Sequence, residues 1–258
     1  MIIPEIQFCP LYLLVFVFGL VIGSFLNVIV YRVPKKISII KGRSYCPACN
    51  HKILNRDLVP VLSYILLRDK CRHCGSKISP RYPIIELSTG LLALGIVLVK
   101  GIFPEALIIF AFGVILLAIS LIDLETMTIP DSLIIAIVPL AILIAWVTGE
   151  WNIWERVIGA LIISIPMYIS LYFVKEGFGG GDIKLFAALG LFLGWKNILL
   201  TILISSVLGA VIGIAMTKSK KENIAGKHIP FGPYICFGAM IAVLFGNAII
   251  SWYLGFYI

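Results

Sequence analysis

The sequence has little charge. Only 13% of its 258 residues are Asp, Glu, Lys or Arg, and 60% are hydrophobic, whereas a soluble domain carries roughly 25% charged residues. This composition excludes an ordinary soluble domain and predicts an all-α polytopic membrane protein, because about 20 apolar residues cross the hydrocarbon core as a helix. Such stretches occupy residues 10–31, 84–103, 105–122, 132–149, 154–174, 197–217 and 231–256. An eighth stretch, 183–195, is short and rich in Gly, so we expect about eight transmembrane helices.

The N-terminal segment lacks basic residues, the first being Arg32. A cleavable signal peptide needs a basic n-region, so residues 10–31 are expected to remain as a helix. Twelve of the 21 Lys and Arg residues lie between Arg32 and Arg81, and with Asp57 and Asp69 they give this loop a formal charge of +10. The positive-inside rule predicts that the loop is cytoplasmic. The orientation of the loop toward the cytoplasm and its attraction to anionic lipids explain this charge. Nucleic-acid binding is disfavoured, because no recognition motif accompanies the charge.

Internal repeats and low-complexity linkers are also missing from the sequence. The basic loop is therefore the predicted boundary, dividing the chain into a first helix (1–31), a loop domain (32–82) and a transmembrane domain (83–258). Counting helices from an outside N-terminus brings Asp123 and Asp182 to the cytoplasmic side.

Four of the six cysteines form two Cys-x-x-Cys motifs in this loop, separated by 21 residues: Cys46, Cys49, Cys71 and Cys74. Four thiolates in this pattern predict a closed, tetrahedral and structural zinc site. The alternative is a pair of disulfides, which a reducing cytoplasm disfavours. His51 and His73 adjoin the motifs and are alternative ligands or solvated neighbours. Cys9 and Cys236 fall outside the motifs and are expected to be buried small residues.

Acidic residues are scarce at membrane depth, and two of them stand out. Asp123 ends a predicted helix, where the macrodipole disfavours negative charge; a hydrogen bond to a neighbouring helix or an interfacial position would explain it without catalysis. Asp182 follows three glycines in "GFGGGD" at a helix start, where it has a simple alternative role as an N-cap. Asp131 follows Pro130 and is interpreted as a capping residue, and Glu125 as a solvated one.

The two aspartates are more informative as a pair. Two carboxylates held close share one proton, so that one serves as base toward a water and the other as acid toward a carbonyl, as in aspartic proteases. Gly179 and Gly181 would let an extended substrate approach Asp182. Lys184 either neutralises charge near the pair or extends to the interface. A different class, a scaffold or transporter with proton-carrying aspartates, stays open at this point.

Six ordered blocks cover nearly the whole chain. They are "GSFLNVIVYRVP" (23–34), the two cysteine motifs, "SPRYPIIELSTG" (79–90), "LIDLETMTIPD" (121–131), "GFGGGDIKLFAALG" (177–190) and "IPFGPYICFGA" (229–239). In these blocks the sequence resembles the prepilin peptidases, or type IV leader peptidases, of the GxGD aspartyl protease group. A scaffold or transporter does not explain the tetracysteine loop or the ordered blocks. The resemblance accounts for both.

The resemblance implies that Asp123 and Asp182 are catalytic, with Gly179, Gly181 and Lys184 as support. It also implies cleavage of the basic leader of type IV prepilins or type II secretion pseudopilins at the cytoplasmic face of a bacterial inner membrane. Members with the large loop often also methylate the new N-terminus with S-adenosylmethionine.

Methyl transfer rests on the resemblance alone, because the sequence has no Gly-rich cofactor loop of the Rossmann kind. Asn27, Arg32 and Glu86 are candidates for this activity. Interhelical hydrogen bonds and positive-inside anchoring explain these three residues equally well. A peptidase without methylation is the nearest alternative.

Overall fold

The computed structural model describes residues 4–40, 42–173, 179–219 and 230–255. Within these ranges the regular secondary structure is helical, apart from two isolated β-bridges in the loop. The long helices are α1 (Pro4–Arg32), α3 (Arg81–Lys100), α4 (Pro104–Thr126), α5 (Asp131–Thr148), α6 (Ile153–Phe173), α7 (Gly180–Ser219) and α8 (Gly232–Leu254). All seven contain a stretch that is long and apolar enough to cross a membrane, which confirms the multi-pass all-α fold.

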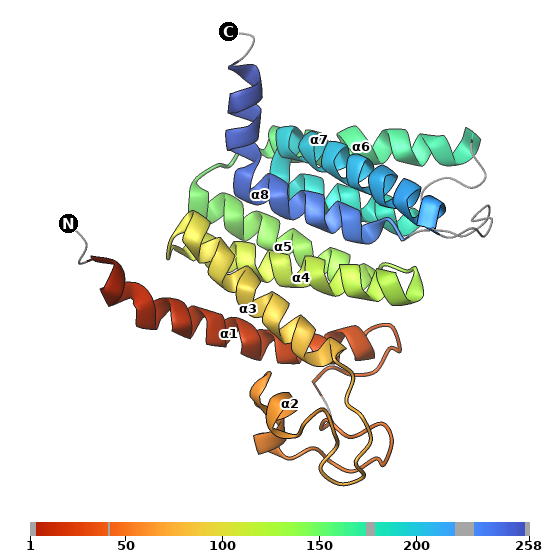
Figure 1. Cartoon of the computed structure of the whole chain (residues 1–258). Coiled ribbons are helices and arrows are strands. Elements are labelled where there is room, and N and C mark those ends of the chain that lie inside the picture. Colours follow the sequence, from red (N-terminus) through yellow and green to blue (C-terminus); the bar gives the residue numbers. More distant parts are fainter. Residues whose placement is uncertain (1–3, 41, 174–178, 220–229, 256–258) are drawn as a thin grey trace. The chain divides into compact units, whose positions relative to one another are not determined.

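By their internal contacts the residues form two compact units, Met1–Ile102 and Phe103–Ile258. Both units can be followed by colour in Figure 1. The predicted division into 1–31, 32–82 and 83–258 is one of membrane topology, and it stays a prediction.

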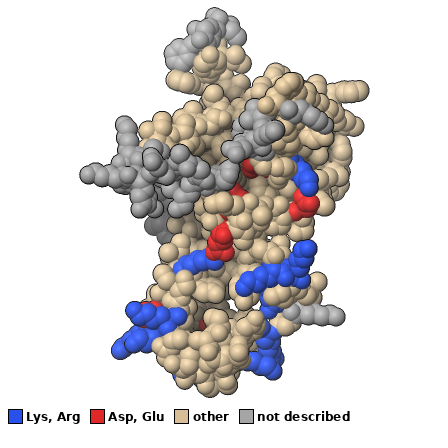
Figure 2. Space-filling view, turned by 90° about the vertical axis from the view of Figure 1, so that its right-hand side faces the viewer, with Lys and Arg blue, Asp and Glu red and all other residues tan. Residues whose placement is uncertain are grey.

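The first unit is built on a close crossing of α1 and α3. A Cβ atom added to Gly19 would lie 2.7 Å from Cα of Gly90, and one added to Gly23 would lie 2.7 Å from Cα of Glu86. Small residues at such positions let two helices approach closely where burial from water offers no driving force. Between the two helices the loop contains the 3-10 helix η1 (Asn55–Leu58) and the short helix α2 (Leu62–Leu66). Figure 2 shows basic side chains gathered at the loop end of this unit.

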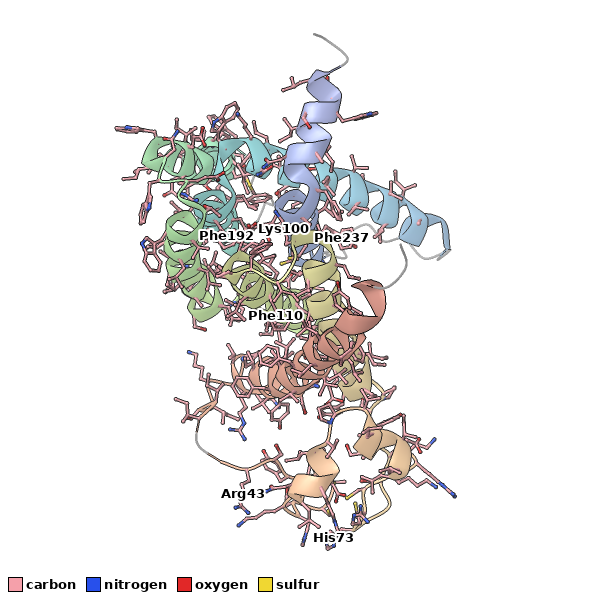
Figure 3. The ribbon with its side chains drawn as sticks, turned by 90° about the vertical axis from the view of Figure 1, so that its left-hand side faces the viewer. Arg43, His73, Lys100, Phe110, Phe192 and Phe237 are labelled. Atoms are coloured by element: carbon pink, nitrogen blue, oxygen red, sulfur yellow. The ribbon has the colours of Figure 1, made fainter. Side chains whose placement is uncertain are left out.

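In the second unit α5, α6 and α8 pack against α7, and α4 packs against α5 and α8 (Figure 1). Phe112 of α4 stacks on Phe192 of α7 with ring centroids 3.9 Å apart and an angle of 1° between the planes, and Phe192 is labelled in Figure 3. Gly159 of α6 and Gly190 of α7 let these helices touch at the backbone.

Helix α7 is broken at Gly194, whose φ of 75° lies in the left-handed region. The predicted stretches 183–195 and 197–217 are therefore the two halves of one bent helix. The break frees carbonyl groups, and Arg156 of α6 donates to two of them, those of Leu191 and Phe192, at 3.0 and 3.1 Å. The half-buried guanidinium of Arg156 thus supplies donors to carbonyl groups at the end of the first half.

Candidate active site

Asp123 lies in the last turn of α4 and is 5% exposed. Its Oδ2 accepts a hydrogen bond of 3.0 Å from the backbone N–H of Gly232, the first residue of α8. The sequence places Asp123 at a helix C-terminus, which disfavours its charge. In the structure the N-terminus of a second helix begins against the same carboxylate and offsets that effect.

Asp182 lies in the first turn of α7 and is half-buried. Its carboxylate lies within electrostatic range of Asp123, and the buried thiol of Cys236 lies within range of both. Thus α4, α7 and α8 bring the two aspartates into one site within the second unit. Cys236 is 3% exposed, as expected for a buried small residue.

The glycines before Asp182 differ in what surrounds them. A Cβ atom at Gly181 would lie 3.1 Å from Cβ of Ile129, and one at Gly179 would lie 3.3 Å from Oδ2 of Asp182. A Cβ atom at Gly180 would meet no described atom within 4 Å. The Gly-x-Gly-Asp pattern therefore has a steric basis, since the two outer glycines are crowded and the middle position is open. Residues Gly177 and Phe178 lie outside the described residues.

Lys184 forms an ion pair that the sequence analysis did not predict, and its expected roles near the aspartates stay predictions. Its Nζ pairs with both carboxylate oxygens of Asp131, at 2.9 and 3.0 Å. Asp131 opens α5, so this ion pair joins the first turns of α5 and α7. Glu125 is exposed near the end of α4. The capping interpretation of Asp131 missed this partner, because the two residues are 53 positions apart in the sequence.

Gly232 is a site residue that the sequence reasoning missed. The block "IPFGPYICFGA" carries it, and a Gly-Pro pair at a helix start is a visible signal. Nothing in that signal indicates that α8 begins against an aspartate 109 residues earlier.

The loop brings its four motif cysteines together. The ligand atoms of Cys46, Cys49, Cys71 and Cys74 lie within 4.8 Å of one another. All cysteines whose side chains the structure describes are free thiols. This cluster is compatible with zinc.

The two cysteine motifs fold alike. Cys46 N–H donates to the His51 carbonyl at 3.0 Å, and Cys71 N–H donates to the Ser76 carbonyl at 2.8 Å. Backbone N–H groups of Cys49 and then Ala48 lower the pKa of Cys46 to about 6. This lowering favours the thiolate, the form that binds a metal.

The rings of His51 and His73 lie against one another, with centroids 3.4 Å apart and planes tilted by 33°. Figure 3 shows His73 at the loop end of the first unit. Among the described residues the group of ligand atoms contains the four cysteines and neither histidine, which supports their interpretation as neighbours of the cluster.

The first unit also contains a partly open cavity of about 580 Å³. It is lined by the end of α1, the start of α3 and the loop between them, and Asn27, Arg32 and Glu86 all contribute to its wall. The aromatic rings of the wall are Phe25, Tyr31, Tyr45, Tyr64 and Tyr82.

All three polar candidates in this wall also make structural hydrogen bonds. Asn27 Nδ2 donates to the Tyr82 carbonyl at 3.3 Å and so joins α1 to α3. Arg32 Nη1 donates to the Ser38 carbonyl at 2.8 Å. Glu86 Oε2 accepts from Val61 N–H at 2.8 Å.

Val61 is the strained point of the cavity wall. Its φ of 61° and ψ of −49° form a tight turn closed by a hydrogen bond from Leu62 N–H to the Pro60 carbonyl. A β-branched residue adopts positive φ only when its surroundings hold it there. The buried Glu86 carboxylate supplies that restraint.

Comparison with known proteins gives matches along most of the chain. Residues 17–100 match the model of the bacterial peptidase A24 N-terminal domain, and residues 110–214 match that of the type IV leader peptidase family. The first match lies within the first compact unit and the second within the second. No solved structure gives a significant match.

Several relatives carry the name prepilin leader peptidase/N-methyltransferase. The chain is 35% identical to one from Aeromonas hydrophila, with 93% of each chain covered. It is 36% identical to one from Stutzerimonas stutzeri, with 93% of this chain and 92% of the relative covered. A third, from Pseudomonas aeruginosa, is 34% identical, with 92% and 91% covered.

Proposed function

Since the chain belongs to the type IV leader peptidase family, we propose that it is an aspartyl peptidase that cleaves the leader of type IV prepilins or type II secretion pseudopilins. The observation that carries this proposal is that Asp123, which is buried, and Asp182, which is half-buried, come from different helices and lie within electrostatic range of one another. A lone buried aspartate is explained by a helix contact, whereas two carboxylates from different helices suit acid–base chemistry.

Asp123 and Asp182 together form the proposed catalytic dyad. The dyad would act directly on water and on the scissile peptide. One carboxylate, in its ionised form, accepts a proton from a water molecule as that water attacks the carbonyl carbon. The other, in its protonated form, donates to the carbonyl oxygen. When the tetrahedral intermediate collapses, the leaving amine takes up a proton and both aspartates return to their starting states.

The chain is a multi-pass protein of the bacterial inner membrane, and we place the dyad and the cysteine loop on its cytoplasmic side. The formal charge of +10 on the loop supports this orientation. A basic leader ahead of an apolar helix would lie at the same face.

The second proposed activity is methylation of the new N-terminus in the first unit. S-adenosylmethionine supplies a methyl group on a positively charged sulfonium when bound. The aromatic rings and the Glu86 carboxylate of the cavity wall would attract such a cation. Asn27, Arg32 and Glu86 would shape this site.

Zinc, held by Cys46, Cys49, Cys71 and Cys74, is proposed as structural. A loop of about 50 residues is too small to be stable through its core alone, so metal binding would contribute its folding energy. Cys46 also belongs to the cavity wall, so the metal site would support the methylation site.

Intact-mass measurement tests both activities in one assay. The purified protein in lipid is incubated with a type IV prepilin, with and without S-adenosylmethionine. We expect loss of the leader in both reactions and a gain of about 14 Da only with the methyl donor. An uncut prepilin would refute the peptidase, and a cut but unmethylated product would refute methyl transfer.

A further inference from the structure

The start of α8 contributes a hydrogen-bond donor to the site in addition to packing against it. Gly232 opens this helix, and its N–H donates to Oδ2 of Asp123 at 3.0 Å in a buried hydrogen bond. Neither the family matches nor the names of the relatives assign this residue a role.

The N–H of Gly232 is the donor that the helix leaves for a side chain. The first N–H groups of a helix have no partner in the preceding turn. At the start of α8, Pro233 has no N–H, and the N–H groups of Tyr234 and Ile235 both donate to the Phe231 carbonyl. Gly232 therefore directs the remaining first-turn donor at Asp123.

The close approach of Asp123 also requires that residue 232 has no side chain. A Cβ atom there would lie 2.6 Å from Oδ2 and 3.0 Å from Cγ of Asp123. The backbone of Gly232 does not have positive φ, so Ala could adopt its conformation. Contact with the carboxylate, rather than backbone freedom, is thus what demands glycine.

The electrostatic effect favours an anion at Asp123. A backbone N–H that donates to a carboxylate makes a charge-assisted hydrogen bond. The positive end of the α8 dipole lies at the same oxygen and adds to this preference. Together they oppose the effect of the α4 C-terminus on which Asp123 stands.

We propose that Gly232 is a positioning residue that holds Asp123 as the ionised member of the dyad, so that Asp182 carries the shared proton; this rests on the proposed peptidase function. Asp123 then takes a proton from the attacking water, while Asp182 gives its proton to the carbonyl oxygen. A C–O bond forms and yields a gem-diol. On collapse the C–N bond breaks, the amine takes the proton from Asp123, and a hydroxyl of the gem-diol returns a proton to Asp182.

The test compares Gly232→Ala with Gly238→Ala. Both glycines are in α8, and a Cβ atom at Gly238 would lie 2.8 Å from the Thr201 carbonyl oxygen, against α7 rather than the dyad. The steady-state kinetics of prepilin cleavage and the thermal stability in detergent are measured for both variants. Displacement of a catalytic group by about 1 Å costs roughly 100-fold in rate.

We expect Gly232→Ala to lower kcat about 100-fold with KM unchanged, and Gly238→Ala to lower thermal stability while keeping kcat near that of the wild type. A wild-type kcat in Gly232→Ala would overturn the proposal. So would parallel loss of kcat in both variants, because displacement of α8 would then explain the effect. If the wild type itself fails to cleave, the peptidase function fails first, so the two failures are distinguishable.

Discussion

Lys184 and Asp131 form an ion pair in which Nζ lies 2.9 Å from Oδ1 and 3.0 Å from Oδ2. The pair ties the first turn of α7, which carries Asp182, to the first residue of α5. Gly181 packs on Ile129 directly beside it. The segment before α5 therefore braces the helix start that presents Asp182.

We predict that Lys184→Ala lowers the rate of leader cleavage by up to about fivefold, since exposed ion pairs contribute at most about 1 kcal/mol. Both side chains are more than half exposed, at 59% and 61%. The charge-swapped double variant Lys184→Asp, Asp131→Lys should recover most of the loss, as judged by a double-mutant cycle. A double variant no better than its parents would show that the pair does not act as a brace.

Gly181→Ala should slow cleavage by about tenfold or more, because its Cβ would press on Ile129 and shift the first turn of α7. Gly180→Ala is the matched control, since an added Cβ there meets no described atom within 4 Å. Initial rates with the same prepilin compare the two. Equal rates would mean that the crowding at Gly181 has no catalytic consequence.

The purified protein should contain about one zinc ion per chain, as expected for one four-thiolate site. The double substitution Cys46→Ser, Cys71→Ser should remove it, which metal analysis measures directly. Because the metal would stabilise the loop, limited proteolysis should cut the loop faster in this variant. Methylation should be lost while leader cleavage continues, since the dyad belongs to the other compact unit. A double variant that keeps its zinc would refute the ligand assignment.

Glu86→Gln should separate the structural and chemical roles of this side chain. The amide oxygen can still accept the hydrogen bond of Val61, so the loop should resist proteolysis as in the wild type. The negative charge beside the proposed sulfonium is lost, and methyl transfer should fall by about tenfold or more, with cleavage unchanged. Methylation at the wild-type rate would show that the cavity does not use this carboxylate.

The sequence predicts those features that depend on local pattern. Apolar stretches of sufficient length become the transmembrane helices, and the regular spacing of Cys46, Cys49, Cys71 and Cys74 predicts their cluster. The two aspartates are also recognisable, since each stands at a helix end on the same predicted side.

Features that depend on contacts between distant segments could not be predicted. The hydrogen bond between Gly232 and Asp123 spans 109 positions, and the pair of Lys184 with Asp131 spans 53. At the bend of α7, Arg156 of α6 donates hydrogen bonds to two carbonyl groups of α7. Composition and spacing do not reveal such partners, because each residue of these pairs has a plausible local role on its own.

Cleavage by the two asparagine variants is the most direct test of the account. Asp123→Asn and Asp182→Asn are compared with the wild type and with Glu125→Gln, which removes an exposed charge two residues from Asp123. The account predicts that either asparagine variant leaves the prepilin uncut, because an amide can neither take up nor supply the proton, and that Glu125→Gln cleaves normally. Normal cleavage by either asparagine variant would contradict the two-aspartate mechanism.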